Sequence, residues 1–342
     1  MKNLCYIAVL PLFALIGSAL GADPSYKIIN RIKMPDGYWD YGASDASKGL
    51  IYWSRAEFTD VIDSKTGALS QLKSAGNAHM ALPVPGTTLI VLPLRSPPRT
   101  VRIVDSGTDK VVSEVPVGDQ PDGMTYDPFS KHVFVVNHSG SDVTEIDPIA
   151  GKAIATIPVG GGKLEFADTD GKGHVFVNIQ ASGEIAVIDV AAHKVTTHYK
   201  MQGCEDATGL AYAAKTNLLI ASCGNGVAKA VAADSGKELA SIPIGKGPDA
   251  VIYDSSRQIA FIPSGVDGVL QIISVVDPAH VALIQKLPTQ ILARTGAVDL
   301  NSGQLYLMAA QPDPTKPTGG GGRPTPKDGT FEMLVIGPAE EK

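Results

Sequence analysis

Short hydrophobic runs flanked by turn-forming residues recur along most of the chain. One clear set lies at 123–126, 133–136, 143–146 and 153–157, separated by steps such as Asp127-Pro-Phe-Ser. Each run is too short for a helix and is rich in β-branched residues, which favour extended backbone. Gly, Asp, Ser and Pro in the intervening steps favour turns. The pattern predicts an all-β chain of consecutive antiparallel strands.

This strand pattern repeats with a nearly constant period. An Ile-Asp or Val-Asp step ends the third run of most units, with Ala232 and Gly337 in place of the aspartate in the fifth and seventh. The first four marker aspartates lie 42 residues apart, at Asp63, Asp105, Asp147 and Asp189. The following intervals are 43, 45 and 60 residues, and the last carries an insertion. Four strands in about 40 to 45 residues are typical of one β-propeller blade.

The number of units predicts how the ring closes. Seven segments supply the first three strands of a blade, but the chain ends before the seventh unit can form its fourth. The segment Tyr26–Met34, followed by Pro35, matches the missing strand. We therefore expect a seven-bladed β-propeller with four antiparallel strands per blade, in which the N-terminal strand closes the last blade and pairs its open edge.

The third unit carries a family resemblance. Val133-Phe-Val-Val-Asn137, Val143-Thr-Glu-Ile-Asp147 and Ile157-Pro-Val-Gly160 resemble the YVTN β-propeller repeat, and the chain is similar to YncE-like members of that family. The likeness covers nearly all of the chain after residue 21 and is best in the third and fourth units. The second, fifth and seventh units depart from it. The resemblance implies a fold but brings no shared catalytic motif, so function must be argued from the site.

The N-terminus predicts export. Lys2 precedes an apolar run from Leu4 to Leu20, and Ala19 and Gly21 occupy the −3 and −1 positions of a cut before Ala22. This layout is that of a signal peptide at residues 1–21, with an uncleaved anchor helix as the alternative. We expect residues 22–342 to form one propeller domain that is periplasmic or secreted, monomeric, and not stably inserted in a membrane.

Composition and motifs narrow the functional classes. The 342 residues are 44% hydrophobic, enough for a large core, and 35 acidic residues against 29 basic ones give a formal charge of −6. Because this charge repels a phosphate backbone, nucleic acid is not expected as a partner. The sequence contains neither a Gly-x-Ser-x-Gly elbow nor a phosphate-binding P-loop, so nucleophilic hydrolase and nucleotidase functions are unsupported.

Two cysteines, Cys204 and Cys223, remain after the expected cleavage. In an exported chain an even number of cysteines favours a disulfide. A metal or redox pair and two free buried thiols are the alternatives. The alignment of the units puts both residues on the face where the innermost strands begin, so a bridge is sterically plausible.

That face is also the mouth of the central channel, and it carries the candidate site. Aligning the units on Asp122 gives a column that differs chemically from blade to blade, which favours one specific site over a uniform solvated rim. His79, Arg95 and His138 are expected at the same mouth. The predicted ligand-binding residues are Trp39, His79, Arg95, Asp122, His138, Lys163, Asp249 and Arg294.

The histidines at the mouth raise the question of a metal. The alignment brings only His79, His138 and Asp122 together, so no metal site and no catalytic residue is predicted, and the cofactor is left open. We interpret His79, Arg95 and His138 as residues that bind an anion or a polar ligand. Glu165, Glu205 and Asp206 add carboxylates nearby, which could serve acid–base hydrolysis or simply be solvated.

Three functional hypotheses follow. The preferred one is a non-enzymatic exported propeller that binds a partner protein or a small polar ligand at the mouth. The second is a propeller enzyme, such as a metal-dependent lactonase or a quinone- or haem-linked oxidoreductase. The third is a structural module of the cell envelope.

The Pro/Gly-rich segment 311–330 joins two strands of the last unit at the mouth, where we expect it to form a mobile loop. Such a loop could serve as a lid or as a partner-binding arm, or it could be a tolerated insertion.

Overall fold

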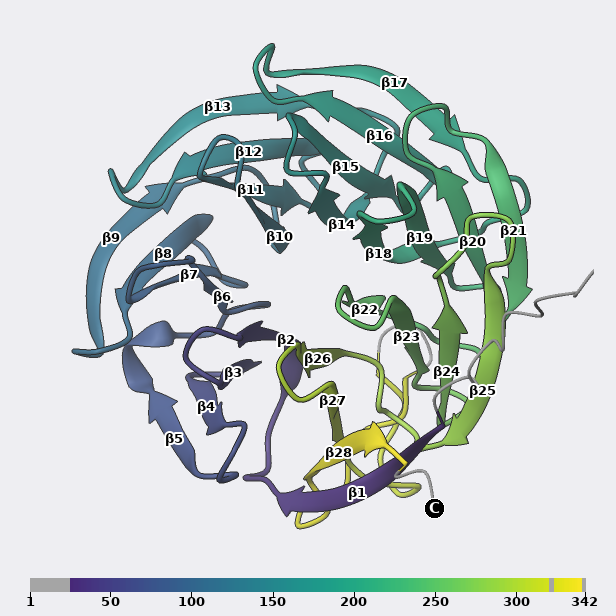
Figure 1. Ribbon diagram of the computed structural model, residues 1–342. Helices are drawn as coiled ribbons and strands as arrows, with labels where there is room; N and C mark the ends of the chain where they lie inside the picture. Colours follow the sequence, from purple (N-terminus) through teal and green to yellow (C-terminus); the bar gives the residue numbers. More distant parts are fainter. Residues whose placement is uncertain (1–24, 320–322, 340–342) are drawn as a thin grey trace, which may run out of the picture.

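The computed structural model describes residues 25–319 and 323–339, which form seven four-stranded antiparallel sheets arranged in a ring (Figure 1). In six sheets the strands follow the chain from the central channel outward, and in the seventh the outermost strand comes from the N-terminal end of the described chain. The predicted all-β, seven-bladed propeller is thereby confirmed. The predicted signal peptide at residues 1–21 lies outside the described residues. Within the described part, no helix is long and apolar enough to cross a membrane.

The strand bounds follow the repeat closely. Blades 1 and 2 comprise β2 (Trp39–Asp45), β3 (Leu50–Arg55), β4 (Thr59–Asp63), β5 (Leu69–Leu72), β6 (Leu82–Pro83), β7 (Leu89–Pro93), β8 (Thr100–Asp105) and β9 (Lys110–Pro116), with the 3₁₀ turn η1 (Lys73–Ala75) between them. Blades 3 and 4 comprise β10 (Pro121–Asp127), β11 (His132–Asn137), β12 (Asp142–Asp147), β13 (Lys152–Pro158), β14 (Leu164–Thr169), β15 (His174–Ile179), β16 (Glu184–Asp189) and β17 (Lys194–Lys200).

The remaining three blades complete the ring. Blades 5 and 6 comprise β18 (Ala207–Ala213), β19 (Leu218–Cys223), β20 (Val227–Ala232), β21 (Glu238–Pro243), β22 (Ile252–Asp254), β23 (Ile259–Ser264), β24 (Val269–Ser274) and β25 (Ala282–Pro288). Blade 7 comprises β26 (Gly296–Asp299), β27 (Gln304–Ala309), β28 (Glu332–Pro338) and β1 (Tyr26–Lys33).

Blade 7 joins the two ends of the described chain. β1 pairs antiparallel with β28, from Tyr26 opposite Pro338 to Lys33 opposite Glu332. The pairing hydrogen-bonds the edge that β28 would otherwise expose. Figure 1 shows β1 along the outer rim beside β28. The predicted closure by the N-terminal strand is confirmed.

The marker aspartates have a local structural role. In blade 3 the Oδ1 atom of Asp147 accepts hydrogen bonds from the backbone N–H groups of Ile149 and Ala150, both at 2.9 Å. Asp63 and Asp189 accept equivalent bonds in their own turns. These Asx turns provide hydrogen bonds for backbone N–H groups in the turn between the third and fourth strands. The periodic aspartate is therefore a turn signal rather than part of the site.

Candidate ligand-binding site

Seven residues, one from each blade, form a polar ring at the mouth of the channel. Cross-strand pairs such as Pro121–Asn137 and Trp39–Arg55 fix the register of the inner strands, and the ring residue directly follows the inner member of each pair. The backbone irregularity after these pairs re-aims the next side chain. This register gives six ring residues, and Arg294 completes the ring in blade 7 through its hydrogen bond to Asp249. The six are Asp40, His79, Asp122, Glu165, Thr208 and Asp249.

A glycine sets the spacing of two ring residues. A Cβ atom on Gly123 would lie 2.8 Å from the carbonyl oxygen of Glu165, closer than real Cβ contacts. The missing side chain lets β10 approach β14, which brings Asp122 close to Glu165. Next to the ring, apolar side chains line a second cavity of about 340 Å³, among them Tyr41, Met80, Met124 and Phe166.

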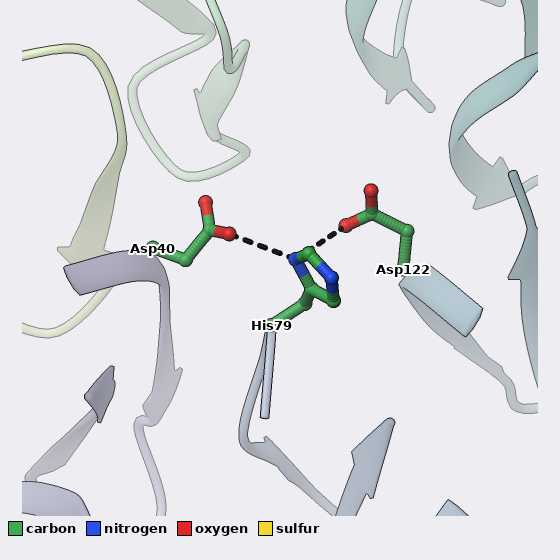
Figure 2. A group of neighbouring side chains, drawn as sticks. All are labelled: Asp40, His79 and Asp122. Carbon is green, nitrogen blue, oxygen red and sulfur yellow. Dashed lines mark hydrogen bonds and ion pairs between the residues drawn. The ribbon is translucent and has the colours of Figure 1, made fainter. Parts of the chain in front are cut away.

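One side of the ring is an ion-paired cluster. Figure 2 shows His79 between Asp40 and Asp122, with Nδ1 facing both carboxylates. The distances are 2.9 Å to Asp40 Oδ2 and 3.2 Å to Asp122 Oδ1. Arg95 Nη1 lies 3.1 Å from the same Asp40 oxygen, and its guanidinium stacks 4.1 Å from the ring centre of Tyr38. Asp40 is therefore held by several donors at once.

The two carboxylates beside His79 differ in environment. Burial opposes ionisation of Asp40, but hydrogen bonds from His79 and Tyr38 and the charge of Arg294 lower its pKa to about 2. Burial raises the pKa of Asp122 to about 7, with the charges of Glu165 and Asp40 adding to it. Because Nδ1 carries a single hydrogen, which points to Asp40 at the shorter distance, Asp122 Oδ1 is left buried without a hydrogen-bond partner.

The other side of Asp122 meets a second histidine and a second carboxylate. His138 Nδ1 lies 3.2 Å from Glu165 Oε2, but the geometry is not that of a hydrogen bond, and this nitrogen is also a buried atom without a partner. Burial raises the pKa of Glu165, although His138 opposes the shift. The interaction with Glu165 raises the pKa of His138 in turn. Asp122, His138 and Glu165 thus form a compact, incompletely bonded group.

Arginines neutralise the far side of the ring. Arg294 Nε donates to Asp249 Oδ2 at 2.8 Å, and both side chains are buried. Arg323 Nη2 donates to the other oxygen of Asp249 at 2.9 Å. Arg294 also donates to the backbone carbonyl of Trp39 at 3.1 Å. Asp249 is therefore fully paired, in contrast to Asp122.

A cavity of about 700 Å³ opens over the ring. Its lining combines ring residues with basic and polar side chains of the surrounding loops. The volume lies within the usual range of small-molecule sites. Among the lining residues are Asp122, His138, Lys163, Glu165, Lys246 and Arg323.

The structure brings most of the sequence-predicted residues together. His79, Asp122, Asp249 and Arg294 belong to the ring, Arg95 contacts Asp40 and His79, and His138 contacts Glu165. The column put Trp39 and Lys163 at ring positions that Asp40 and Glu165 take, although Lys163 lines the cavity over the ring. Both errors are of register along the chain.

The indole of Trp39 packs into the apolar core instead of the ring. Its side chain is 2% exposed and meets Phe331 edge to face with ring centres 5.3 Å apart. Asp40, one residue later, takes the ring position because adjacent side chains of a strand point to different sides. Trp39 lines a smaller neighbouring cavity of about 340 Å³ together with Arg294 and Arg323. Lys163 is exposed on the rim, and Glu165, two residues later, occupies the ring of blade 4.

Three contributors to the site were not in the predicted set. Asp40 and Glu165 were missed because units with unequal loops were aligned without a fixed strand register. Arg323 lies in the 311–330 segment, where the described residues pair through Asp313 N to Thr325 O at 2.7 Å and Lys327 N to Gln311 O at 2.8 Å. Its contact with Asp249 carries no sequence signal, since it depends on how that segment crosses the mouth.

Cys204 and Cys223 form a disulfide, with Cα atoms 5.4 Å apart. Cys223 ends β19, and Cys204 lies in the loop before β18. The bridge therefore ties a mouth loop to a strand of its own blade. It lies beside the site and does not belong to the ring.

Comparison with known proteins supports the fold only. No protein-family model and no curated protein matches the sequence. Among solved structures, the chain is similar to a chain of Kuenenia stuttgartiensis hydrazine synthase, with a TM-score of 0.70 and 13% identity over 81% of this chain and 94% of that one. It is also similar to a chain of a mitotic checkpoint complex, with a TM-score of 0.69 and 12% identity over 90% and 96%. Both likenesses are to the propeller architecture.

Proposed function

We propose that this protein is a non-enzymatic binding propeller that takes a small polar ligand with an anionic group at the channel mouth. The observation that carries the proposal is the cavity of about 700 Å³ over a ring of chemically different residues. Lys163, Lys246 and Arg323 line it and offer positive charge to an anion, while Thr208 and Gln180 offer hydrogen bonds to hydroxyl groups. A concave polar site of this size favours a small molecule over the flat surface of a partner protein.

The test uses defined probes. Thermal unfolding of the purified protein is measured with gluconate and citrate as anionic probes and with glucose as the neutral control. An anionic probe that binds the native state at 100 times its Kd adds about 2.7 kcal/mol of stability, which raises Tm. Lys163→Ala and Lys246→Ala are expected to reduce the shift, and Lys215→Ala, on an exposed turn, is the matched control. A Tm that no anionic probe moves, together with no co-purifying small anion by mass spectrometry, contradicts the proposal.

A metal-dependent hydrolase, such as a lactonase, is the second candidate. It is favoured by the proximity of the buried Glu165 to the half-buried Asp122 and His138. Hydrolysis of gluconolactone above the spontaneous rate, measured with added Mn²⁺ or Zn²⁺ and lost in Glu165→Gln, would support it. Equal rates with and without the protein reject it.

Membership of the YVTN-repeat, YncE-like family and export to the periplasm or medium are part of the same proposal. The repeat residues of blades 3 and 4 and the N-terminal layout ending at Gly21 support them. The intact mass of protein recovered from the exporting host is expected to correspond to a chain that begins at Ala22. A cell-envelope structural module would instead show self-assembly in gel filtration or tight association with the envelope.

A further inference from the structure

We propose that Asp122, His138 and Glu165 form a binding site for one divalent transition-metal ion at the mouth of the channel. One ligand atom from each residue lies within 4.8 Å of the other two. His138 Nδ1 and Glu165 Oε2 are 3.2 Å apart, close to the ~3.4 Å that separates ligand atoms around a tetrahedral ion with bonds of about 2.1 Å. Small side-chain movements complete the arrangement. The site does not require the proposed ligand, although it faces the same cavity.

Two atoms of this group are available to bind a metal ion. Asp122 Oδ1 and His138 Nδ1 are both buried and have no hydrogen-bond partner among the described residues. Leaving buried polar atoms without a hydrogen bond destabilises the folded protein. A cation between them accepts both lone pairs and removes the repulsion between the carboxylates of Asp122 and Glu165.

The neighbouring group of Asp40, His79 and Asp122 has similar spacing but a different charge environment. Arg95 Nη1 lies 3.1 Å from Asp40 Oδ2 and 3.3 Å from His79 Nδ1. This guanidinium already occupies the place of a cation and would repel a metal ion. Within the described chain, the ion-pair partners of Asp122 and Glu165 are the two histidines alone. The cation site therefore falls on the His138 side of Asp122.

The ligand types indicate the metal. One imidazole nitrogen and two carboxylate oxygens suit Zn²⁺, Mn²⁺ or Fe²⁺ better than Ca²⁺, which prefers six or more oxygen ligands. Three protein ligands leave one or more coordination positions open. These positions face the cavity of about 700 Å³, where an anionic group of a ligand could complete the coordination.

The test measures metal binding without any organic ligand. Untagged protein is freed of metal with EDTA and titrated with Zn²⁺ and Mn²⁺ by calorimetry, and Co²⁺ is added to record its ligand-field spectrum. We expect one ion per chain. Glu165→Gln, which keeps the shape and removes the charge, and His138→Gln should each weaken binding at least about tenfold. His280→Gln, at an exposed histidine of the β24–β25 connection, is the matched control and should leave the affinity within about twofold. His79→Gln reports on the other group and should weaken binding less than His138→Gln.

The outcomes separate this inference from the proposed function. Circular dichroism and thermal unfolding first establish that each variant is folded. A stoichiometry near zero, or an affinity unchanged by Glu165→Gln, overturns the metal site. A loss in His79→Gln as large as in His138→Gln also overturns it, because the ion would then lie on the Asp40 side. A Tm shift with gluconate that persists in EDTA leaves the proposed function standing even if the metal site fails.

Discussion

Arg55 and Asp60 form an ion pair inside blade 1, with Nη1 and Oδ2 2.6 Å apart and side chains 1% and 0% exposed. The same guanidinium donates to the backbone carbonyls of Pro35 and Tyr38 at 2.6 and 2.8 Å. Arg55 thereby fixes the loop that leads into β2 and Asp40. This buried ion pair therefore helps to hold Asp40 in its position in the ring.

Removing one partner of this pair should be costly. Arg55→Met leaves the Asp60 carboxylate buried without its countercharge, and we expect a loss of about 3–5 kcal/mol in the free energy of urea unfolding. The double variant Arg55→Met/Asp60→Leu should be more stable than Arg55→Met alone, because no charge remains to be buried. A double variant no more stable than the single one would show that the ion pair has little effect.

Closure of the ring should depend on the packing of β28. Ile336 is fully buried and lies opposite Ile28 of β1 and Leu305 of β27. Ile336→Ala should lower the free energy of unfolding by about 2–5 kcal/mol through lost burial and a residual cavity. Ile149→Ala, on a turn at 66% exposure, is the control and should stay within about 0.5 kcal/mol. Similar losses in both variants would argue against a special role for the closing sheet.

The Cys204–Cys223 bridge should stabilise the mouth. It spans 19 residues. A loop of that size corresponds to about 3 kcal/mol from restriction of the unfolded chain. Cys204→Ala/Cys223→Ala, and the unaltered protein after reduction, should therefore unfold at a lower temperature than the oxidised protein. Thiol titration verifies reduction, and an unchanged Tm after complete reduction would refute a stabilising role.

Asp168 should make stability depend on pH. Burial raises the pKa of this carboxyl from 3.8 to about 6, although backbone N–H groups of Tyr212 and Thr169 oppose the shift. Between about pH 4 and pH 6 the native state keeps a proton that the unfolded chain releases. The contribution of Asp168 to stability is thus full below pH 4 and falls as the pH rises through this window.

Asp168→Asn should flatten that part of the profile. The free energy of unfolding is measured by urea at several pH values from 4 to 6.5 for both proteins. Asp234→Asn, on an exposed turn, is the control and should keep the slope of the original protein. An equal slope in Asp168→Asn would mean that another group is responsible for the pH dependence.

Part of the site was within reach of sequence reasoning, and part was not. Asp122, Asp249 and Arg294 could be aligned because each lies six residues after the proline that ends the preceding outer strand. Trp39 and Lys163 were misplaced by one and two residues, since a strand's register is fixed only by its cross-strand partner. A one-residue offset exchanges an apolar core residue for a channel carboxylate.

The sequence by itself determined the blade, the number of blades and the closure by the N-terminal strand. These features are local or countable: β-branched runs, Asx turns at Asp63 or Asp147, and a repeat of nearly constant length. Only the tertiary structure decided that Glu165 lies beside His138, that Arg95 balances Asp40, and that Arg323 reaches Asp249. Those pairs join residues from different blades or loops, and their distances follow from how the ring packs, which no single repeat specifies.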